Sequence, residues 1–266
     1  MEDSKPKLWI VGDSFSYLDN NDLNNDAWPL LLPRSLNWDS TNNSLKGTSQ
    51  DWAWRIIRDW QFDIKPNDQL IIALTHPSRV WFFEDRPELA NYNIVDLDVL
   101  LGDKERLLAV KYYVEQIQRP EIDIQATDHR MGWLSNLVYR NNWRKPIIIQ
   151  GFAQTIYTDL YPNLIFSKGN LFTVNRKEEA KDFPSKNWDL RYNHMCLSNH
   201  KILVEKIINT INTGEELDLT TGFIENNYSK KLLEDKDLAA KELSTYRLED
   251  YHKVDPIIPW TLRFKS

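Results

Sequence analysis

Short apolar runs alternate with stretches of helical periodicity along most of the chain. The clearest runs are Lys7–Val11, residues 68–75 and residues 145–151, and Asn163–Phe166 and Leu171–Val174 are weaker candidates for a last short strand or hairpin. A continuous apolar run of this length is typical of a strand buried on both faces of a parallel sheet. Because helices alternate with these runs, the pattern predicts an α/β protein with a mainly parallel sheet and right-handed crossovers.

Apolar residues at helical spacing predict the elements between the strands. One helix is expected from Ser49, a candidate N-cap, to Trp60. Another is expected from Ser198, also a candidate cap, to a stop at Gly214. Further helices are predicted over residues 27–32, 105–118, 127–143 and 228–246.

These elements divide the chain into one large domain and a tail. Residues 1–214 are expected to form the α/β domain, with an insertion over residues 80–144 whose helices pack on the sheet or cover the site. Residues 215–266 are expected to be a C-terminal extension, and their alternating charge is typical of a solvated helical face. The apolar segment at residues 255–264 can dock on the domain or engage a protein partner.

Composition and charge exclude several classes of function. The 266 residues are 41% hydrophobic, which is enough for one substantial core. A net charge of -6 gives no basic field for nucleic acid. No apolar run reaches the length of a signal peptide or a membrane span, so we expect a cytoplasmic protein without a membrane partner. The single cysteine, Cys196, excludes an internal disulfide, and the chain has no clustered metal ligands or phosphate loop, so no cofactor or metal is expected.

The first predicted strand runs directly into Gly12-Asp13-Ser14. A glycine just past a strand allows a sharp turn, which puts Ser14 at the carboxyl edge of the sheet. Ligands bind at this edge in open α/β sheets, and a hydroxyl there is a nucleophile if a base reaches it. These are also common turn residues, so the alternative is an ordinary strand-to-loop turn.

A segment with two histidines precedes the last helix of the predicted domain. His194 falls in the loop before this helix, whereas His200 falls in its first turn. The helix dipole keeps a histidine in the first turn neutral, and such a residue often only packs or caps. His194 is therefore preferred over His200 as a general base.

A strand-end Gly-Asp-Ser near the N-terminus, with an Asp/His segment before a late helix, resembles the SGNH (GDSL-type) hydrolases. The resemblance covers most of residues 7–213. It implies a flavodoxin-like three-layer α/β/α fold and a triad of Ser14, His194 and Asp189. The family's aspartate sits three residues before the histidine, where this chain has Arg191, whereas Asp189 lies five residues before it.

The resemblance also implies an oxyanion hole. Gly47, just before the predicted helix, matches a family glycine, so the amides of Ser14 and Gly47 would bind the oxyanion. In the family the next strand ends in Gly-x-Asn-Asp, and the asparagine completes the hole. This chain has Thr75-His76-Pro77-Ser78-Arg79 in that place, so Thr75 or His76 is the candidate replacement donor. Asp13 and Arg79 are candidate substrate-binding residues, Arg79 for an anionic or polar group.

The implied activity is that of an esterase, lipase or carbohydrate deacetylase that needs no metal. Eleven tryptophans and eleven tyrosines favour a carbohydrate or acyl-sugar ester as the substrate. Nucleotide or flavin binding is disfavoured because the first loop lacks a phosphate-binding composition. The main alternative is a non-enzymatic binding or structural protein of the same fold. The strand exit Thr-x-Pro-x-Arg is similar to that of phage-encoded SGNH-like proteins, for which a place in the virion would be expected.

Overall fold

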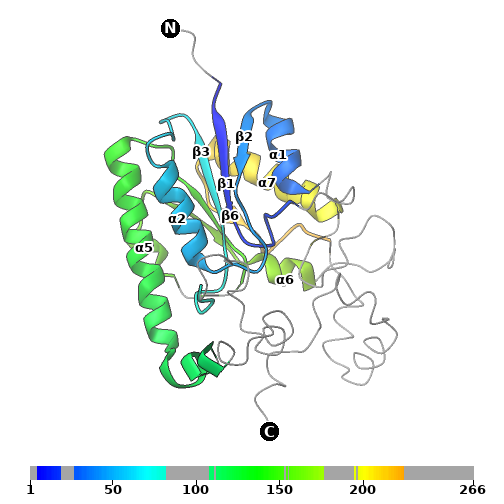
Figure 1. Cartoon of the computed structure of the whole chain (residues 1–266). Helices are drawn as coiled ribbons and strands as arrows, with labels where there is room; N and C mark the ends of the chain where they lie inside the picture. Colours follow the sequence, from blue (N-terminus) through cyan, green and yellow to red (C-terminus); the bar gives the residue numbers. More distant parts are fainter. Residues whose placement is uncertain are drawn as a thin grey trace, which may run out of the picture.

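Six parallel strands form one sheet within the part of the chain that the computed structural model describes (Figure 1). They are β1 (Lys7–Gly12), β2 (Asp39–Asn42), β3 (Gln69–Leu74), β4 (Ile147–Gln150), β5 (Ile165–Lys168) and β6 (Leu217–Asp218). Their order is β2-β1-β3-β4-β5-β6, and every neighbouring pair is parallel. The first five strands follow the flavodoxin-like order. The described residues are 5–18, 27–81, 108–110, 112–152, 154, 156–176, 195 and 197–224.

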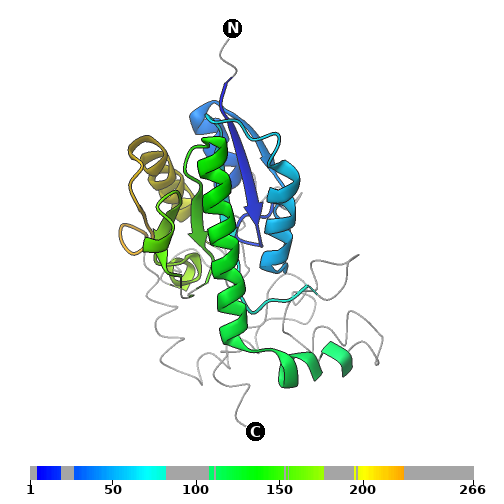
Figure 2. The ribbon, with the colours of Figure 1, turned by 90° about the vertical axis from the view of Figure 1, so that its left-hand side faces the viewer.

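Helices cover both faces of the sheet. The helices are α1 (Trp28–Leu36), α2 (Gln50–Trp60), α5 (Pro120–Asn141), α6 (Leu171–Arg176) and α7 (Leu197–Thr213). Helices α2 and α5 lie side by side over one face, and α1 and α7 lie over the other (Figures 1 and 2). This three-layer α/β arrangement confirms the fold class predicted from the sequence.

The alternation of side chains along each strand divides the core between the two faces. In β1, Trp9 and Val11 pack towards α2 and α5, whereas Leu8 and Ile10 pack towards α1 and α7. The central strand β3 is buried at all six positions, which explains why its sequence is a continuous apolar run. The long helix α5 contributes Met131, Leu134 and Val138 to the core, so the described part of the insertion packs on the sheet.

Several predicted elements are confirmed. Strands β1, β3 and β4 and helices α1, α2 and α7 lie where the sequence predicts them. The Ser49 hydroxyl caps α2 by accepting a hydrogen bond from the amide of Asp51. Gly214 follows α7 with a φ of 74°, which is the left-handed conformation of a helix stop. Ser198 lies inside α7 and does not cap it.

Other predictions were wrong. Strand β2 was missed, because its residues Asp-Ser-Thr-Asn are polar and it lies at the edge of the sheet. Residues 171–174 belong to helix α6 and not to a strand, and α5 begins at Pro120, seven residues earlier than expected. The helix expected over residues 105–118 is helical in its described part, at residues 108–110 and 112, and includes a π-helical turn, Tyr113–Ile117. Strand β6 follows Gly214, so the sheet extends past the expected domain boundary. The predicted helix 228–246 and the apolar segment 255–264 lie outside the described residues.

Replacing Gly12 by alanine should destabilise the fold by about 3 kcal/mol, because there is no room for a side chain there. A Cβ atom at Gly12 would lie 2.4 Å from the carbonyl oxygen of Ala73 and 2.6 Å from the Ser16 hydroxyl. The matched control is Gly132→Ala in α5, where the nearest heavy atom is 3.8 Å away. This second change should stabilise the protein by about 0.5–1 kcal/mol through helix propensity. Urea unfolding measures the free energy of unfolding of both variants. Equal changes in Gly12→Ala and Gly132→Ala would contradict the prediction.

Candidate functional site

The candidate site lies where the chain changes direction across the sheet. The crossover from β1 to β2 passes through α1 on one face, and the crossover from β2 to β3 passes through α2 on the other. The carboxyl ends of β1 and β3 are therefore a topological switch point, the usual position of a ligand site in such sheets. Ser14 follows β1, and Thr75 and His76 follow β3, so the structure brings these three predicted residues to one edge.

Buried hydrogen bonds hold the loop around Ser14. The Asp13 carboxylate accepts from the amide of Phe15 at 3.1 Å, and the Asp13 carbonyl accepts from the amide of Ser16 at 3.0 Å. The carbonyl of Phe15 accepts from Trp28 Nε1 at 2.8 Å, and that of Ser16 accepts from Asn42 Nδ2 at 2.8 Å. The backbone on the C-terminal side of Ser14 is thus fixed by α1 and β2, which are remote in sequence.

Ser14 itself is half-buried, and neither its amide nor its hydroxyl bonds to any described residue. The loop that carries Gly47 lies beside it, because the amide of Leu45 donates to the carbonyl of Gly12 at 3.0 Å. Gly47 has a φ of 70°, a conformation that favours glycine. The Thr48 hydroxyl closes this turn by donating to the carbonyl of Leu45 at 3.0 Å.

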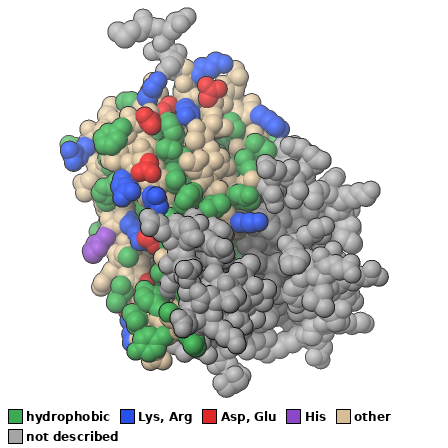
Figure 3. Space-filling model, viewed as in Figure 1, with side chains coloured by type: hydrophobic (Ala, Val, Ile, Leu, Met, Phe, Trp, Pro, Cys, Tyr) green, Lys and Arg blue, Asp and Glu red, His purple; other side chains and the backbone are tan. Residues whose placement is uncertain are grey.

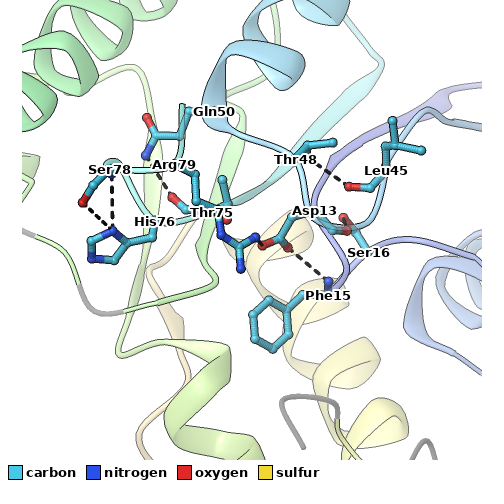
Figure 4. A network of polar contacts seen from close by, with 10 residues as sticks. All are labelled: Asp13, Phe15, Ser16, Leu45, Thr48, Gln50, Thr75, His76, Ser78 and Arg79. Carbon is cyan, nitrogen blue, oxygen red and sulfur yellow. Dashed lines mark hydrogen bonds and ion pairs between the residues drawn. The ribbon is translucent and has the colours of Figure 1, made fainter. Parts of the chain in front are cut away.

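A buried ion pair connects the exit of β1 to the exit of β3 (Figure 4). Arg79 Nη1 lies 3.3 Å from Asp13 Oδ2, and the two side chains are 10% and 0% exposed. The Arg79 guanidinium also lies 5.0 Å from the centre of the Phe152 ring. Asp13 and Arg79 were expected to bind substrate. Asp13 has no exposed surface and instead anchors the Ser14 loop through Arg79 and the amide of Phe15.

The hydrogen bonds of His76 show which ring nitrogen carries the proton, and its surroundings favour the neutral form. Its Nδ1 accepts from the amide of Ser78 at 3.3 Å and lies 2.9 Å from the Ser78 hydroxyl. An amide can only donate, so Nδ1 is unprotonated and the ring proton is on Nε2. Burial, and then the charge of Arg79, lower the pKa of His76 below its ordinary value. At neutral pH His76 is therefore a hydrogen-bond donor through Nε2, which fits its predicted role at an oxyanion.

His200 has the same tautomer for the same reason. Its Nδ1 accepts from the backbone amide of Trp28 at 3.3 Å, at the first turn of α1. With the proton on Nε2, this imidazole cannot take a proton from a serine through that nitrogen. The preferred base His194 and its predicted partner Asp189 lie outside the described residues, as does Cys196, so the triad stays a prediction.

Two features of the site were missed by the sequence prediction. Phe152, just after β4, contacts the rings of Phe15 and Phe172 with centroids 5.4 Å away in each case. Gln50, in the first turn of α2, is 1% exposed and bonds to residues of three other segments. A glutamine in the first turn of an amphipathic helix has no sequence feature that distinguishes it from a solvated residue.

Comparison with models of known protein families found no match, and comparison with curated proteins found none either. Within the described residues, no helix combines the length and hydrophobicity needed to cross a membrane, and no three metal-ligating side chains come together. Among the described residues on the face seen in Figure 3, lysine and arginine side chains are interspersed with aspartate and glutamate and form no continuous basic patch.

Replacing Arg79 by methionine should lower the free energy of unfolding by about 3–5 kcal/mol, because it leaves the buried Asp13 carboxylate without its cation. Arg58→Met is the matched control. Arg58 pairs with Asp59 at 3.7 Å, and these side chains are 64% and 59% exposed. The control should change stability by less than about 0.5 kcal/mol. Urea unfolding compares the two, and a similar small loss in both would show that the buried pair does not anchor the loop.

His76 should make stability depend on pH in a defined direction. The pKa of His76 is lower in the folded protein than its ordinary value of 6.5. At a pH between the folded and unfolded pKa, the unfolded chain therefore binds more protons than the folded one. The difference in free energy of unfolding between wild type and His76→Gln should be largest above about pH 7 and should decrease towards pH 5. Urea unfolding across this range measures the difference, and the control is His129→Gln at an exposed position of α5. A difference that is constant with pH, or grows in acid, would contradict the assignment.

Proposed function

We propose that the protein is a serine hydrolase of the SGNH type that acts on esters, with Ser14 as the nucleophile. The observation that supports this most is the difference between Ser14 and the residues that follow it in the same loop. The residues after Ser14 are held by buried hydrogen bonds, whereas the Ser14 amide and hydroxyl have no partner among the described residues. A nucleophile needs this combination of a fixed backbone and reactive groups left available for the substrate.

The position of His194 in the chain also supports the proposal. Its neighbour Met195 is 2% exposed and belongs to the same core cluster as Phe15, the neighbour of Ser14. The residue next to His194 and the residue next to Ser14 thus pack on the same face of the sheet. His200, the alternative base, has its Nδ1 engaged by the amide of Trp28.

In the proposed reaction Ser14 Oγ attacks the ester carbonyl carbon while His194 takes the hydroxyl proton, and Asp189 orients the imidazole. The carbonyl oxygen gains the electron pair and accepts hydrogen bonds from the amides of Ser14 and Gly47 and from a donor at the end of β3. His194 then gives its proton to the leaving alcohol as the carbon–oxygen bond breaks. Water attacks the acyl-serine by the same steps, which releases the acid and restores Ser14.

An aromatic pair beside the site favours an acylated carbohydrate as substrate. Trp52 and Trp81 are both partly exposed, with ring centroids 5.9 Å from each other, and Arg55 lies 5.4 Å from the Trp81 ring. Trp52 Nε1 donates to the carbonyl of Asn43 at 2.8 Å, in the loop that leads to Gly47. Indole rings offer a flat apolar surface and a polar edge, the combination that suits a sugar ring.

Two measurements test the proposal: labelling by a fluorophosphonate probe and hydrolysis of p-nitrophenyl acetate. The wild-type protein should be labelled on Ser14, and Ser14→Ala should lose both labelling and hydrolysis. His194→Ala should lower the hydrolysis rate about a hundredfold or more, because it removes the general base. Ser16→Ala, in the same loop, is the matched control and should remain active, since the Ser16 hydroxyl only bonds to the carbonyl of Asp13.

A folded wild-type protein that is neither labelled nor faster than the buffer blank would show that the hydrolase proposal is wrong. The alternative would then be a binding or structural protein of the same fold. The absence of an asparagine in Thr75-His76-Pro77-Ser78-Arg79 is the feature of this chain that favours this alternative.

A further inference from the structure

Helix α5 carries large apolar side chains on its outer face as well as on its inner one. On the inner face, Met131 and Leu134 are fully buried in the core. On the outer face, Ile122 and Tyr139 are 60% and 76% exposed, and Trp133, between them in the sequence, is 39% exposed. Figure 2 shows α5 nearest the viewer, with no other described helix or strand in front of it. A surface helix normally has one apolar face, so the second one indicates a surface that another molecule covers.

The exposed apolar surface continues into the helical turns that precede α5. Leu108, Tyr112 and Ile117 are each more than half exposed. The π-helical turn Tyr113–Ile117 is one residue longer than an α-helical turn, which returns Ile117 to the side of the helix that carries Tyr112. Figure 3 shows hydrophobic side chains gathered over the start of α5, at the lower left. Single exposed apolar residues are ordinary on a protein surface, whereas a group of them marks an interaction surface. We call this surface, made of Leu108, Tyr112, Ile117, Ile122, Trp133 and Tyr139, the α5 surface.

Charged residues give the α5 surface an acidic end and a basic end. Glu121 and Asp123 lie in the first turn of α5, and Arg140 lies in its last turn. Glu121 is the neighbour of Ile122 in the sequence, and Arg140 is the neighbour of Tyr139. A second α5 that runs antiparallel to the first therefore brings Glu121 and Ile122 of each copy against the basic end of the other copy. A parallel arrangement would instead place like charges side by side, which is unfavourable.

We propose that the α5 surface is the interface of a homodimer, in which the α5 helices of two copies pack antiparallel across a twofold axis. In this arrangement the surface is its own complement, which favours a second copy of the chain as the occupant. The 22 residues of α5 span about 33 Å, which matches the diameter of a standard interface patch of about 800 Å² per partner. A lipid surface fits less well, because anionic lipids attract basic residues and α5 begins with acidic ones.

The antiparallel arrangement also determines where the two candidate sites lie. Helix α5 begins near the carboxyl edge of the sheet and runs antiparallel to the strands (Figure 1). When two α5 helices run in opposite directions, the carboxyl edges of the two sheets do so too. The two Ser14 loops therefore lie at opposite ends of the dimer, and the proposed dimer does not depend on the proposed function.

Sedimentation velocity of the full chain over a range of concentrations tests the dimer. Wild type should change from monomer to dimer as the concentration rises to about 200 μM. Ile122→Ser and Tyr139→Ser should each raise the dissociation constant about tenfold or more, because the twofold axis makes each substitution remove two contacts. Ile224→Ser is the matched control and should dimerise as wild type does. Ile224 is 38% exposed, and its backbone bonds to Asn199 of α7, on the other face of the sheet.

An exchange of charges tests the antiparallel arrangement itself. Glu121→Arg and Arg140→Glu should each weaken the dimer, and the two changes in one chain should restore it, because opposite charges then face each other again. Glu205→Arg, at an exposed position of α7, is the control for a reversed charge and should leave the dissociation constant unchanged. Melting temperatures show that each variant is folded.

A wild-type protein that stays monomeric over the whole concentration range would overturn the proposal. A dimer that Ile122→Ser and Tyr139→Ser leave unchanged would overturn it too, since the interface would then lie elsewhere. A dimer that both weaken and that the double charge variant does not restore would overturn the antiparallel arrangement. If an apolar variant does not fold, the single and double charge variants decide the question.

Discussion

The close approach of β1 to β3 at Gly12 is the constraint on which the site depends. Gly12 pairs with Ala73, and no side chain larger than hydrogen fits between the two strands there. Because the strands are parallel, this contact brings Ser14 and Thr75 out of the sheet side by side. The Asp13–Arg79 ion pair then ties the two exits together in a buried setting. Residues that are 61 positions apart in the sequence thus form one small structural unit.

The polar groups of this unit fall into two kinds. Those that hold the loops in place bond to backbone groups: the Asp13 carboxylate, the Trp28 indole, the Asn42 amide and the Gln50 amide. The Thr75 hydroxyl and the Gln154 amide nitrogen are buried and have no hydrogen-bond partner among the described residues. A buried ion pair contributes little net stability over an apolar pair, so we interpret Asp13–Arg79 as fixing geometry.

Sequence patterns predicted the elements that are buried on both sides and missed those that are short, polar or exposed. Strands β1, β3 and β4 are apolar because helices cover both faces, whereas β2 at the edge is polar and β6 has only two residues. The carboxyl ends of parallel strands meet, so the sequence could place Ser14, Thr75 and His76 at one edge. It could not identify Gln50 and Gln154, because the burial of Gln50 depends on Thr127, which is 77 positions away. The sequence did single out Asp13 and Arg79, but it could not show that they pair with each other, because they are 66 positions apart.

The hydrogen bonds of the histidines bear on which of them is the general base of the proposed hydrolase. His76 and His200 each accept a backbone amide at Nδ1, so each carries its ring proton on Nε2 and acts as a donor there. His129 is exposed on α5. A base that accepts the Ser14 proton through Nε2 needs the opposite tautomer, with Nδ1–H held by an acceptor such as a carboxylate. His194 follows Asp189 by five residues and precedes Met195, which packs in the same cluster as Phe15. We therefore keep His194 as the proposed base, because a carboxylate lies near it in the sequence and the described bonds of His76 and His200 leave each with its ring proton on Nε2.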